Sequence, residues 1–297
     1  MGRRKLEWWE SAVGNSRSFL EYYDYLTEMT VSTISWGEEL PDGFDERFLE
    51  LSLFTRGNAV GFYDEVLKWY LTLECIPQSN LDLYGNPLVR TGKGRNGAQF
   101  PNLTSENSVM FYNNYLRTPT AFVALQYAQK LYELDQTIAV NTAAQKTPVL
   151  IVCDDEKQRL SLQNLYAQYK GNAPVIYGTN ALGSQPIKSI STGAPFIADR
   201  LYQLKREYIN EYLTQVGIPV ANTDKRERLI SMEVTASNGG TDASKFSRLG
   251  ARQQSAKEFN KMFGTNLNPQ YRADLQEYIG NMVDRGMDIK SETEVSE

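Results

Sequence analysis

Histidine is absent from this sequence of 297 residues. Without imidazole, a protein cannot build a His-assisted serine or cysteine nucleophile, the common zinc sites or an imidazole proton shuttle. The absence therefore excludes the most frequent hydrolase and zinc-enzyme chemistries. Two-carboxylate catalysis and phosphate transfer stay open.

Cysteine and long apolar runs are also scarce. Cys75 and Cys153 lie in dissimilar surroundings, so we interpret them as buried structural thiols in a reducing compartment rather than a disulfide framework. No run of 18 apolar residues occurs, and the basic first residues lead into Glu-Trp-Trp-Glu instead of an apolar signal core. We therefore expect neither secretion nor a membrane span.

Positive net charge is missing as well, since the formal net charge is -5 and the pI is about 5.1. A protein that coats nucleic acid nonspecifically needs a basic face, so that function is not expected. The chain has 41% hydrophobic and 23% charged residues, which is typical of a globular protein.

Helical spacing of apolar residues predicts most of the secondary structure. It indicates an amphipathic helix over residues 16–36, a short helix capped by Asp45 and ended by Gly57, and a third helix around 63–74. Residues 76–108 are rich in Asn, Gly and Pro, which favours strands or loops.

The middle of the chain predicts an extended helical hairpin with a compact tip. Thr118 and Pro119 open one long helix that runs to about Asn141, and Pro195 opens another that Gly217 stops. The helices bracket a strand over 147–153, a short helix over 161–168 and a strand over 173–177. The apolar stripes expected on the two helices are Phe122, Leu125, Ala128, Leu131, Leu134 and Ile138, then Leu201, Leu204, Tyr208, Tyr212 and Val216.

A long polar segment follows the second helix. Residues 222–245 include the run Ser237-Asn238-Gly239-Gly240 and are predicted to form a loop, before a helix over about 249–263 that ends at Gly264. Helix connections usually need only about 2–8 residues, so the length of this loop calls for a function. The last seven residues predict a solvated acidic tail.

Two short motifs have alternative interpretations. Gly92–Gly97 fits G-x-G-x-x-G, but Pro101 opposes the helix that a dinucleotide site requires, so a surface loop is favoured over a nucleotide-processing enzyme. The N-terminal Arg3, Arg4 and Lys5 and the later Lys225, Arg226 and Arg228 are candidates for phosphate contacts. Their alternatives are a solvated terminus and a salt-bridged helix end.

Three stretches resemble one known family: "FLELSLFTRGNAVGFY" at 48–63, "YNNYLRTPT" at 112–120 and "IAVNTAAQKTPVLIVCDDEKQRLSLQNLYAQYKGNAPVIY" at 138–177. Together with Lys225–Leu229, they resemble the portal proteins, also called head-tail connectors or upper collar proteins, of small short-tailed bacteriophages of the Bacillus-phage connector type. The likeness spans nearly the whole chain and is weakest at 76–108.

The resemblance implies a mainly α fold with small β elements (α+β), assembled as a ring, usually a dodecamer. The implied parts are a basic N-terminal arm (1–15), wing (16–118), stem helix (119–148), clip (149–192), stem helix (193–218), tunnel-loop region (219–248), and second wing part with acidic tail (249–297).

The resemblance also implies a function without catalysis or cofactors. A portal stands at the capsid vertex of the virion, admits double-stranded DNA during packaging, retains it, releases it at ejection and joins head to tail. The implied partners are further copies of the chain, the major capsid and scaffolding proteins, a separate packaging ATPase and the lower collar or tail proteins, but no membrane. Assembly takes place in the host cytoplasm. A monomeric virion adaptor is the alternative within this setting.

The implied site is the DNA channel. The family presents two lysine rings, whose ungapped counterparts here are Ser191 and Arg200, so Lys188 is the candidate replacement for the first ring. The arm residues Arg3, Arg4 and Lys5 are implied to contact the motor or nucleic acid. The implied channel residues are Lys188, Arg200, Lys225, Arg226, Arg228, Ser237, Asn238, Gly239, Gly240 and Lys245.

Overall fold

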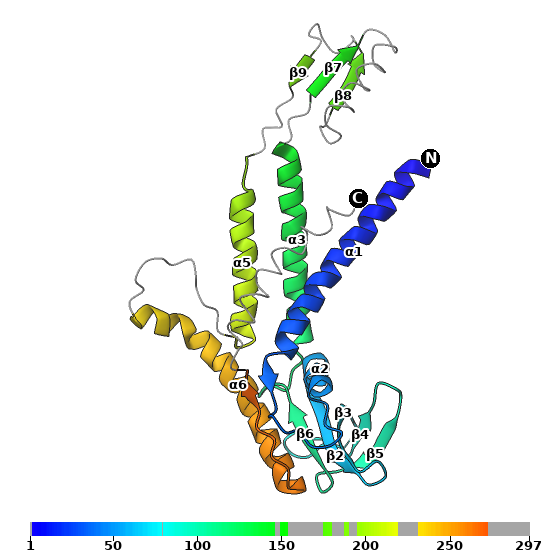
Figure 1. The fold of residues 1–297 in the computed structure, drawn as a ribbon, viewed down its shortest axis with the longest axis vertical. Helices are drawn as coiled ribbons and strands as arrows, with labels where there is room; N and C mark the ends of the chain where they lie inside the picture. The colour runs from blue at the N-terminus through cyan, green and yellow to red at the C-terminus, as the bar shows by residue number, and fades with distance from the viewer. Residues whose placement is uncertain are drawn as a thin grey trace. The chain divides into compact units, whose positions relative to one another are not determined.

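The computed structural model describes residues 2–78, 80–145, 149–153, 175–179, 187–189, 195–218 and 231–272. In these residues the fold is mainly helical with small sheets, which confirms the predicted class (Figure 1). The chain divides into a larger unit, residues 1–132 with 206–297, and a smaller unit, residues 133–205. The helices are α1 (Gly2–Val31), α2 (Glu46–Arg56), α3 (Ala121–Gln145), α5 (Ala198–Gln215) and α6 (Ser231–Phe263).

The larger unit contains an antiparallel sheet of five strands in the order β5-β4-β3-β2-β6. The helix predicted around residues 63–74 is wrong, because this segment forms the hairpin of β2 and β3. The Asp64 carboxylate accepts the backbone N–H groups of Val66 and Leu67, and Lys68 adopts φ 59°, which together turn the chain. The strand or loop character predicted for 76–108 is confirmed. The strands are β2 (Asn58–Asp64), β3 (Trp69–Pro77), β4 (Arg90–Lys93), β5 (Gln99–Leu103) and β6 (Ser108–Tyr112).

Both faces of this sheet are covered by apolar side chains. One face packs with α2 and α6, where Phe259 is fully buried against Phe111 and Phe44. The opposite face carries a second cluster around Val60, Phe62, Cys75, Leu103 and Met110. Burial raises the pKa of the Cys75 thiol to about 11, which confirms its structural role.

The short helix α2 begins and ends as predicted. The Asp45 carboxylate accepts the Phe48 N–H at 2.8 Å, and Gly57 ends the helix with φ 81° and donates its N–H to Leu53. Helix α1 differs from the prediction, because it begins at Gly2 and ends at Val31. The resemblance implied a basic arm over residues 1–15, and the structure describes residues 2–15 as part of this helix. After α1, β1 (Ile34–Ser35) pairs antiparallel with β10 (Gln270–Tyr271).

The loop predicted over residues 222–245 is wrong from Ser231 onward, where α6 begins. Ser237, Asn238, Gly239 and Gly240 therefore lie inside a helix. Two glycines cost about 1 kcal/mol each relative to alanine, which a helix anchored by tertiary packing can offset. Tertiary packing holds α6 directly after the two glycines. Thr241 is buried, and a Cβ on Gly217 would lie 2.7 Å from the backbone nitrogen of Lys245. Residues 222–230 lie outside the described residues.

The two long central helices confirm the predicted hairpin with two corrections. Helix α3 begins after Thr120, whose carbonyl accepts the N–H groups of Val123 and Ala124, so the cap is two residues after Thr118. Phe122 and Leu125 are exposed instead of buried, because the buried stripe follows Ala124, Tyr127, Ala128, Leu131 and Leu134. Helix α5 is followed by Gly217 with φ 77°, as predicted.

In the larger unit, α1, α3 and α5 share one apolar cluster. Tyr127 and Tyr212 meet edge to face at 5.5 Å, and the Tyr212 hydroxyl donates to the Leu26 carbonyl at 3.1 Å. Lys130 lies over the rings of Tyr127 and Tyr208 at 4.4 and 4.9 Å. These contacts hold together the parts of α3 and α5 that belong to the larger unit.

The smaller unit contains a three-stranded sheet and the distal parts of α3 and α5. β7 (Val149–Cys153) pairs parallel with β8 (Val175–Thr179) and antiparallel with β9 (Ile187–Ser189), which confirms both predicted strands. Asn141 donates to the Pro195 carbonyl at 2.9 Å and accepts the Ile197 N–H at 3.1 Å. Lys205 and Asp135 form a buried ion pair at 3.2 Å. The helix predicted over 161–168 lies outside the described residues.

Candidate nucleic-acid interface

Two of the basic residues predicted to face DNA lie in the smaller unit. Arg200 is in the first turn of α5, is exposed, and forms no ion pair with any residue that the structure describes. Lys188 is in β9, where it pairs in register with Leu150 of β7. The structure therefore places both candidates near the ends of the segment that connects α3 to α5.

The surroundings of Arg200 are acidic. Asp199 and Glu207 are exposed on the same helix, while Lys205 is buried in its ion pair with Asp135. A phosphate group approaching the start of α5 is therefore attracted by the Arg200 guanidinium group and repelled by the Asp199 carboxylate.

The other predicted channel residues do not gather with Arg200 and Lys188. Ser237, Asn238, Gly239, Gly240 and Lys245 lie on α6 in the larger unit. The Lys245 ammonium lies over the Tyr271 ring at 4.9 Å, so this residue packs against β10 instead of extending from a loop. Lys225, Arg226 and Arg228 lie outside the described residues.

The basic residues of the N-terminus lie in the first turn of α1. This turn carries Arg3, Arg4 and Lys5 and no acidic residue. The N-terminal end of a helix favours negative charge, by about 0.3–1 kcal/mol per group. Helix stability therefore does not explain these basic residues.

A buried charged cluster, which the sequence did not predict, lies at the centre of the larger unit. Arg252 of α6 donates to both carboxylate oxygens of Glu50 in α2, at 2.8 and 2.7 Å, and to the Asn113 carbonyl at 2.6 Å. Trp36 donates its indole N–H to Glu50 at 2.9 Å. Asn113 in turn donates to the Thr118 carbonyl and the Thr120 hydroxyl, both at 2.8 Å, just before α3. The cluster thus joins α2, α6 and the end of β6 to the start of α3.

The glycine-rich motif does not form a nucleotide site. Gly92–Gly97 is the turn of the β4–β5 hairpin, closed by bonds from Gly94 N–H to Ala98 and from Gly97 N–H to Gly94, at 2.9 and 3.0 Å. Strand β5, not a helix, follows it, so no helix N-terminus is available to a pyrophosphate. The structure therefore does not favour the nucleotide-processing alternative.

Two further searches covered the described ranges. Within them, no three Cys, Asp or Glu side chains gather as ligands for a metal ion. No helix in the described part of the chain combines the length and apolar character needed to cross a membrane.

Comparison with solved structures identifies phage portals as similar folds. A chain of the portal and tail of native bacteriophage P68 has 16% identity and a TM-score of 0.55, with 99% of this chain and 98% of that chain covered. An HK97-family phage portal protein from Corynebacterium diphtheriae has 11% identity and a TM-score of 0.39, with 89% and 93% covered. A chain of the virion of a native gene transfer agent particle has 10% identity and a TM-score of 0.41, with 96% and 90% covered.

The sequence itself matches a family over almost its full length. The family described as Phage Connector (GP10) matches residues 4–276, which confirms the resemblance predicted from the three quoted stretches. This family is structural, and its members are located at the head-tail junction of the virion. The chain belongs to the phage connector family, the head-tail connectors or portal proteins of bacteriophages.

Proposed function

We propose that copies of this chain form a ring, a dodecamer in its working state, around a channel for double-stranded DNA at the capsid vertex. The family match over residues 4–276 is the observation that carries this proposal. DNA enters through the channel during packaging, is retained there and leaves at ejection, while the ring joins the head to the tail.

Exposed apolar side chains on the central helices, and Phe196 just before α5, support a ring. In the larger unit, Phe122 and Leu125 of α3 are 68% and 44% exposed, and in the smaller unit Val140, Phe196 and Tyr202 are 69%, 61% and 47% exposed. Burial of apolar surface contributes about 25 cal/mol per Å², so contact with neighbouring copies stabilises these faces. A head-to-tail contact between copies forms a ring when its repeated rotation closes on itself.

The parts of the ring follow the hairpin. The helices over 119–148 and 193–218 form the stem, residues 149–192 form the clip, and residues 16–118 with 249–297 form the wing. The stem and clip supply the channel residues Lys188 and Arg200, and the basic residues of 225–228 lie after the second stem helix. We omit Lys245 because its ammonium lies on the Tyr271 ring.

The ring performs no catalysis in this proposal. A separate packaging ATPase supplies the energy and docks at the clip, and Arg3, Arg4 and Lys5 contact this motor or nucleic acid. The wing contacts the major capsid and scaffolding proteins, and the lower collar or tail proteins bind the completed vertex. The absence of histidine and the hairpin geometry of Gly92–Gly97 support this division of labour.

Electron microscopy and light scattering test the ring directly. Purified protein is expected to give annular particles with a mass near twelve times 33.7 kDa. A stable single subunit under all solution conditions contradicts the ring and favours the monomeric adaptor.

Arg200→Glu is expected to weaken DNA retention without preventing ring assembly. The exchange replaces one positive by one negative charge per subunit in an already acidic surface, so the affinity of rings for linear duplex should fall about tenfold or more at low salt. Filter binding at several salt concentrations measures this affinity, and Arg95→Glu, in the exposed β4–β5 turn, is the matched control. Unchanged affinity in the Arg200 variant contradicts its place in the channel.

A further inference from the structure

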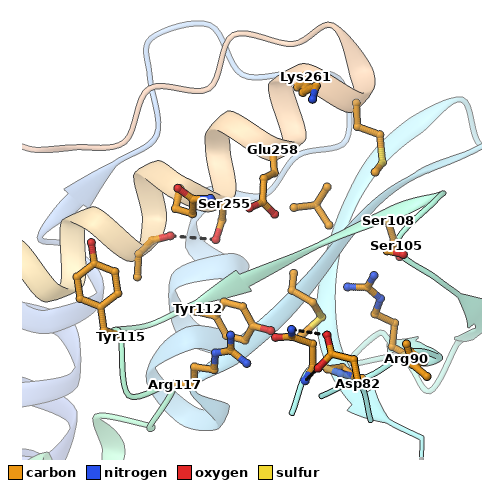
Figure 2. A pocket seen from close by; sticks show the side chains of 18 of the residues that line it. Asp82, Arg90, Ser105, Ser108, Tyr112, Tyr115, Arg117, Ser255, Glu258 and Lys261 are labelled. Atoms are coloured by element: carbon orange, nitrogen blue, oxygen red, sulfur yellow. Dashed lines mark hydrogen bonds between the residues drawn. The ribbon is translucent and has the colours of Figure 1, made fainter. Parts of the chain in front are cut away.

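A pocket in the larger unit has no role in the proposed channel. It has a volume of about 740 Å³ and lies between β4, β6, the loop over residues 81–88 and α6 (Figure 2). Pockets of about 300–1,000 Å³ that combine apolar walls with a few polar groups are typical binding sites.

Arg90 is the main polar group of this pocket. The residue is only 4% exposed, and its Nε has no hydrogen-bond partner among the described residues. Figure 2 shows its guanidinium group directed into the interior of the pocket. Burial lowers the pKa of Arg90, because desolvation disfavours its charged form. A buried guanidinium group with an unsatisfied N–H destabilises a protein, so the hydrogen bonds of the described residues do not explain this residue.

The remaining charges leave the pocket favourable to an anion. Arg117 lies over the Tyr112 ring at 4.2 Å, and Lys261 is exposed at the α6 side. Of the two carboxylates, Asp82 accepts the Tyr84 and Asn86 N–H groups and the Asn86 side-chain amide, at 2.8, 2.7 and 2.7 Å. These bonds lower the pKa of Asp82, so its negative charge is engaged in hydrogen bonds within its own turn.

The second carboxylate of the pocket, that of Glu258, accepts from the Gln254 side chain at 2.8 Å. It lies one helical turn from that partner on α6, and no hydrogen bond joins it to Arg90 within the described residues. The three cations of the pocket therefore outnumber its two carboxylates, both of which already accept hydrogen bonds.

The rest of the pocket and its surroundings are apolar. Leu88, Met110 and Met262 contribute to its lining. In the neighbouring loops, Leu83 and Leu116 are 98% and 81% exposed. Exposed apolar side chains beside a pocket are typical of sites of protein interaction. A small inorganic anion makes no use of such a surface.

We propose that this pocket binds a segment of another protein of the phage particle, which carries an Asp, Glu or chain-terminal carboxylate next to a large apolar side chain. The carboxylate pairs with the guanidinium group of Arg90, and the apolar side chain packs against Leu88 and Met262. Among the turns that the structure describes, β2–β3 has a similar composition at Glu65, Val66 and Leu67, but Glu65 is paired with Lys68 at 3.0 Å. We therefore assign the pocket to another protein and not to a second copy.

Peptide binding tests the assignment. Overlapping 12-residue peptides from the major capsid, scaffolding and lower collar proteins of the same phage, labelled with fluorescein, are titrated with the full-length protein. At least one peptide with an acidic residue beside an apolar one is expected to bind. Both Arg90→Met and exchange of the acidic residue for its amide should weaken binding tenfold or more, while Arg95→Met should not change it.

Three outcomes of the peptide titration overturn the proposal outright. They are binding of no peptide, binding that Arg90→Met leaves unchanged, and competition by inorganic phosphate as strong as by the peptide, which indicates a free anion. Tightest binding by residues 60–71 of this chain indicates an interface between copies and overturns the choice of occupant. Ring formation is scored separately by electron microscopy, so a failure of the ring proposal does not affect this test.

The stability of the free protein gives a second, independent readout. Arg90→Met removes a buried charge that lacks a partner, so the melting temperature should rise by about 2–4 °C. A residue that recognises a partner is often retained although it lowers stability. Arg90→Met should therefore show weaker peptide binding together with a higher melting temperature. A lower melting temperature shows that Arg90 has a structural partner and overturns the proposal.

Discussion

Replacement of Arg252 by methionine is expected to lower the free energy of unfolding by about 3–5 kcal/mol, the usual effect of removing one partner of a buried ion pair. The Glu50 side chain is only 2% exposed, and methionine leaves its carboxylate without the guanidinium partner. The substitution also removes the donor to the Asn113 carbonyl. The cluster joins α2, β6, α6 and the start of α3, so the loss should affect the whole larger unit.

Urea unfolding followed by tryptophan fluorescence measures this loss, because Trp36 is part of the cluster. Protein concentration is held constant, since association shifts apparent stability. Arg56→Met is the control: its ion pair with Glu74 is long, at 3.5 Å, and exposed, so the variant should lose less than about 1 kcal/mol. The double variant Glu50→Leu with Arg252→Met should be more stable than Arg252→Met alone, because it leaves no unpaired buried carboxylate. Equal stability of Arg252→Met and wild type contradicts the prediction.

Gly57→Ala is expected to lower the free energy of unfolding by about 2–4 kcal/mol. The residue has φ 81°, where an alanine costs about 1 kcal/mol or more. Its new Cβ would also lie 2.6 Å from the Arg117 carbonyl oxygen and 2.8 Å from the Thr118 carbonyl carbon. Both obstacles are backbone atoms of the segment that leads into α3, and displacing a packed segment costs about 1–3 kcal/mol.

Gly264→Ala separates the two causes. Gly264 follows the last residue of α6 with φ 69°, and nothing lies within 4 Å of an added Cβ. This control therefore has the backbone strain without the clash and should lose only about 1 kcal/mol. Melting curves of the two variants, measured side by side, show whether they differ. An equal loss in both contradicts the close approach of α2 to the segment before α3.

Local signals were sufficient to predict the elements that end in strong caps. Asp45 and Gly57 bound α2, and the glycine after α5 has the positive φ that stops a helix. The strands β7 and β8 were predicted because short apolar runs follow proline. Each of these predictions depended on residues within a few positions of the element.

Predictions failed where distant contacts overcame local preference. The polar, glycine-bearing start of α6 favours a loop by composition, but the helix is anchored beyond it by Thr241 and by the close approach of Gly217. The hairpin of β2 and β3 has helical spacing in its apolar residues, but its pairing with neighbouring strands decides the structure.

The sequence predicted the family, and its channel residues stay predictions, but it indicated neither Arg90 nor Arg252 as a buried residue. Glu50 and Arg252 are 202 residues apart, and no local pattern connects them. Arg90 has no distinguishing neighbours in the sequence, and its burial follows from the packing of loop 81–88 and α6 around the sheet. The burial and contacts of such residues can be recognised only in the folded structure.

The amide of Asn141 has a consequence for how these proteins diverge. One side chain closes the base of the segment that connects α3 and α5, by holding both Pro195 and Ile197. Substitutions, insertions or deletions in the connecting segment should therefore leave the alignment of α3 with α5 unchanged.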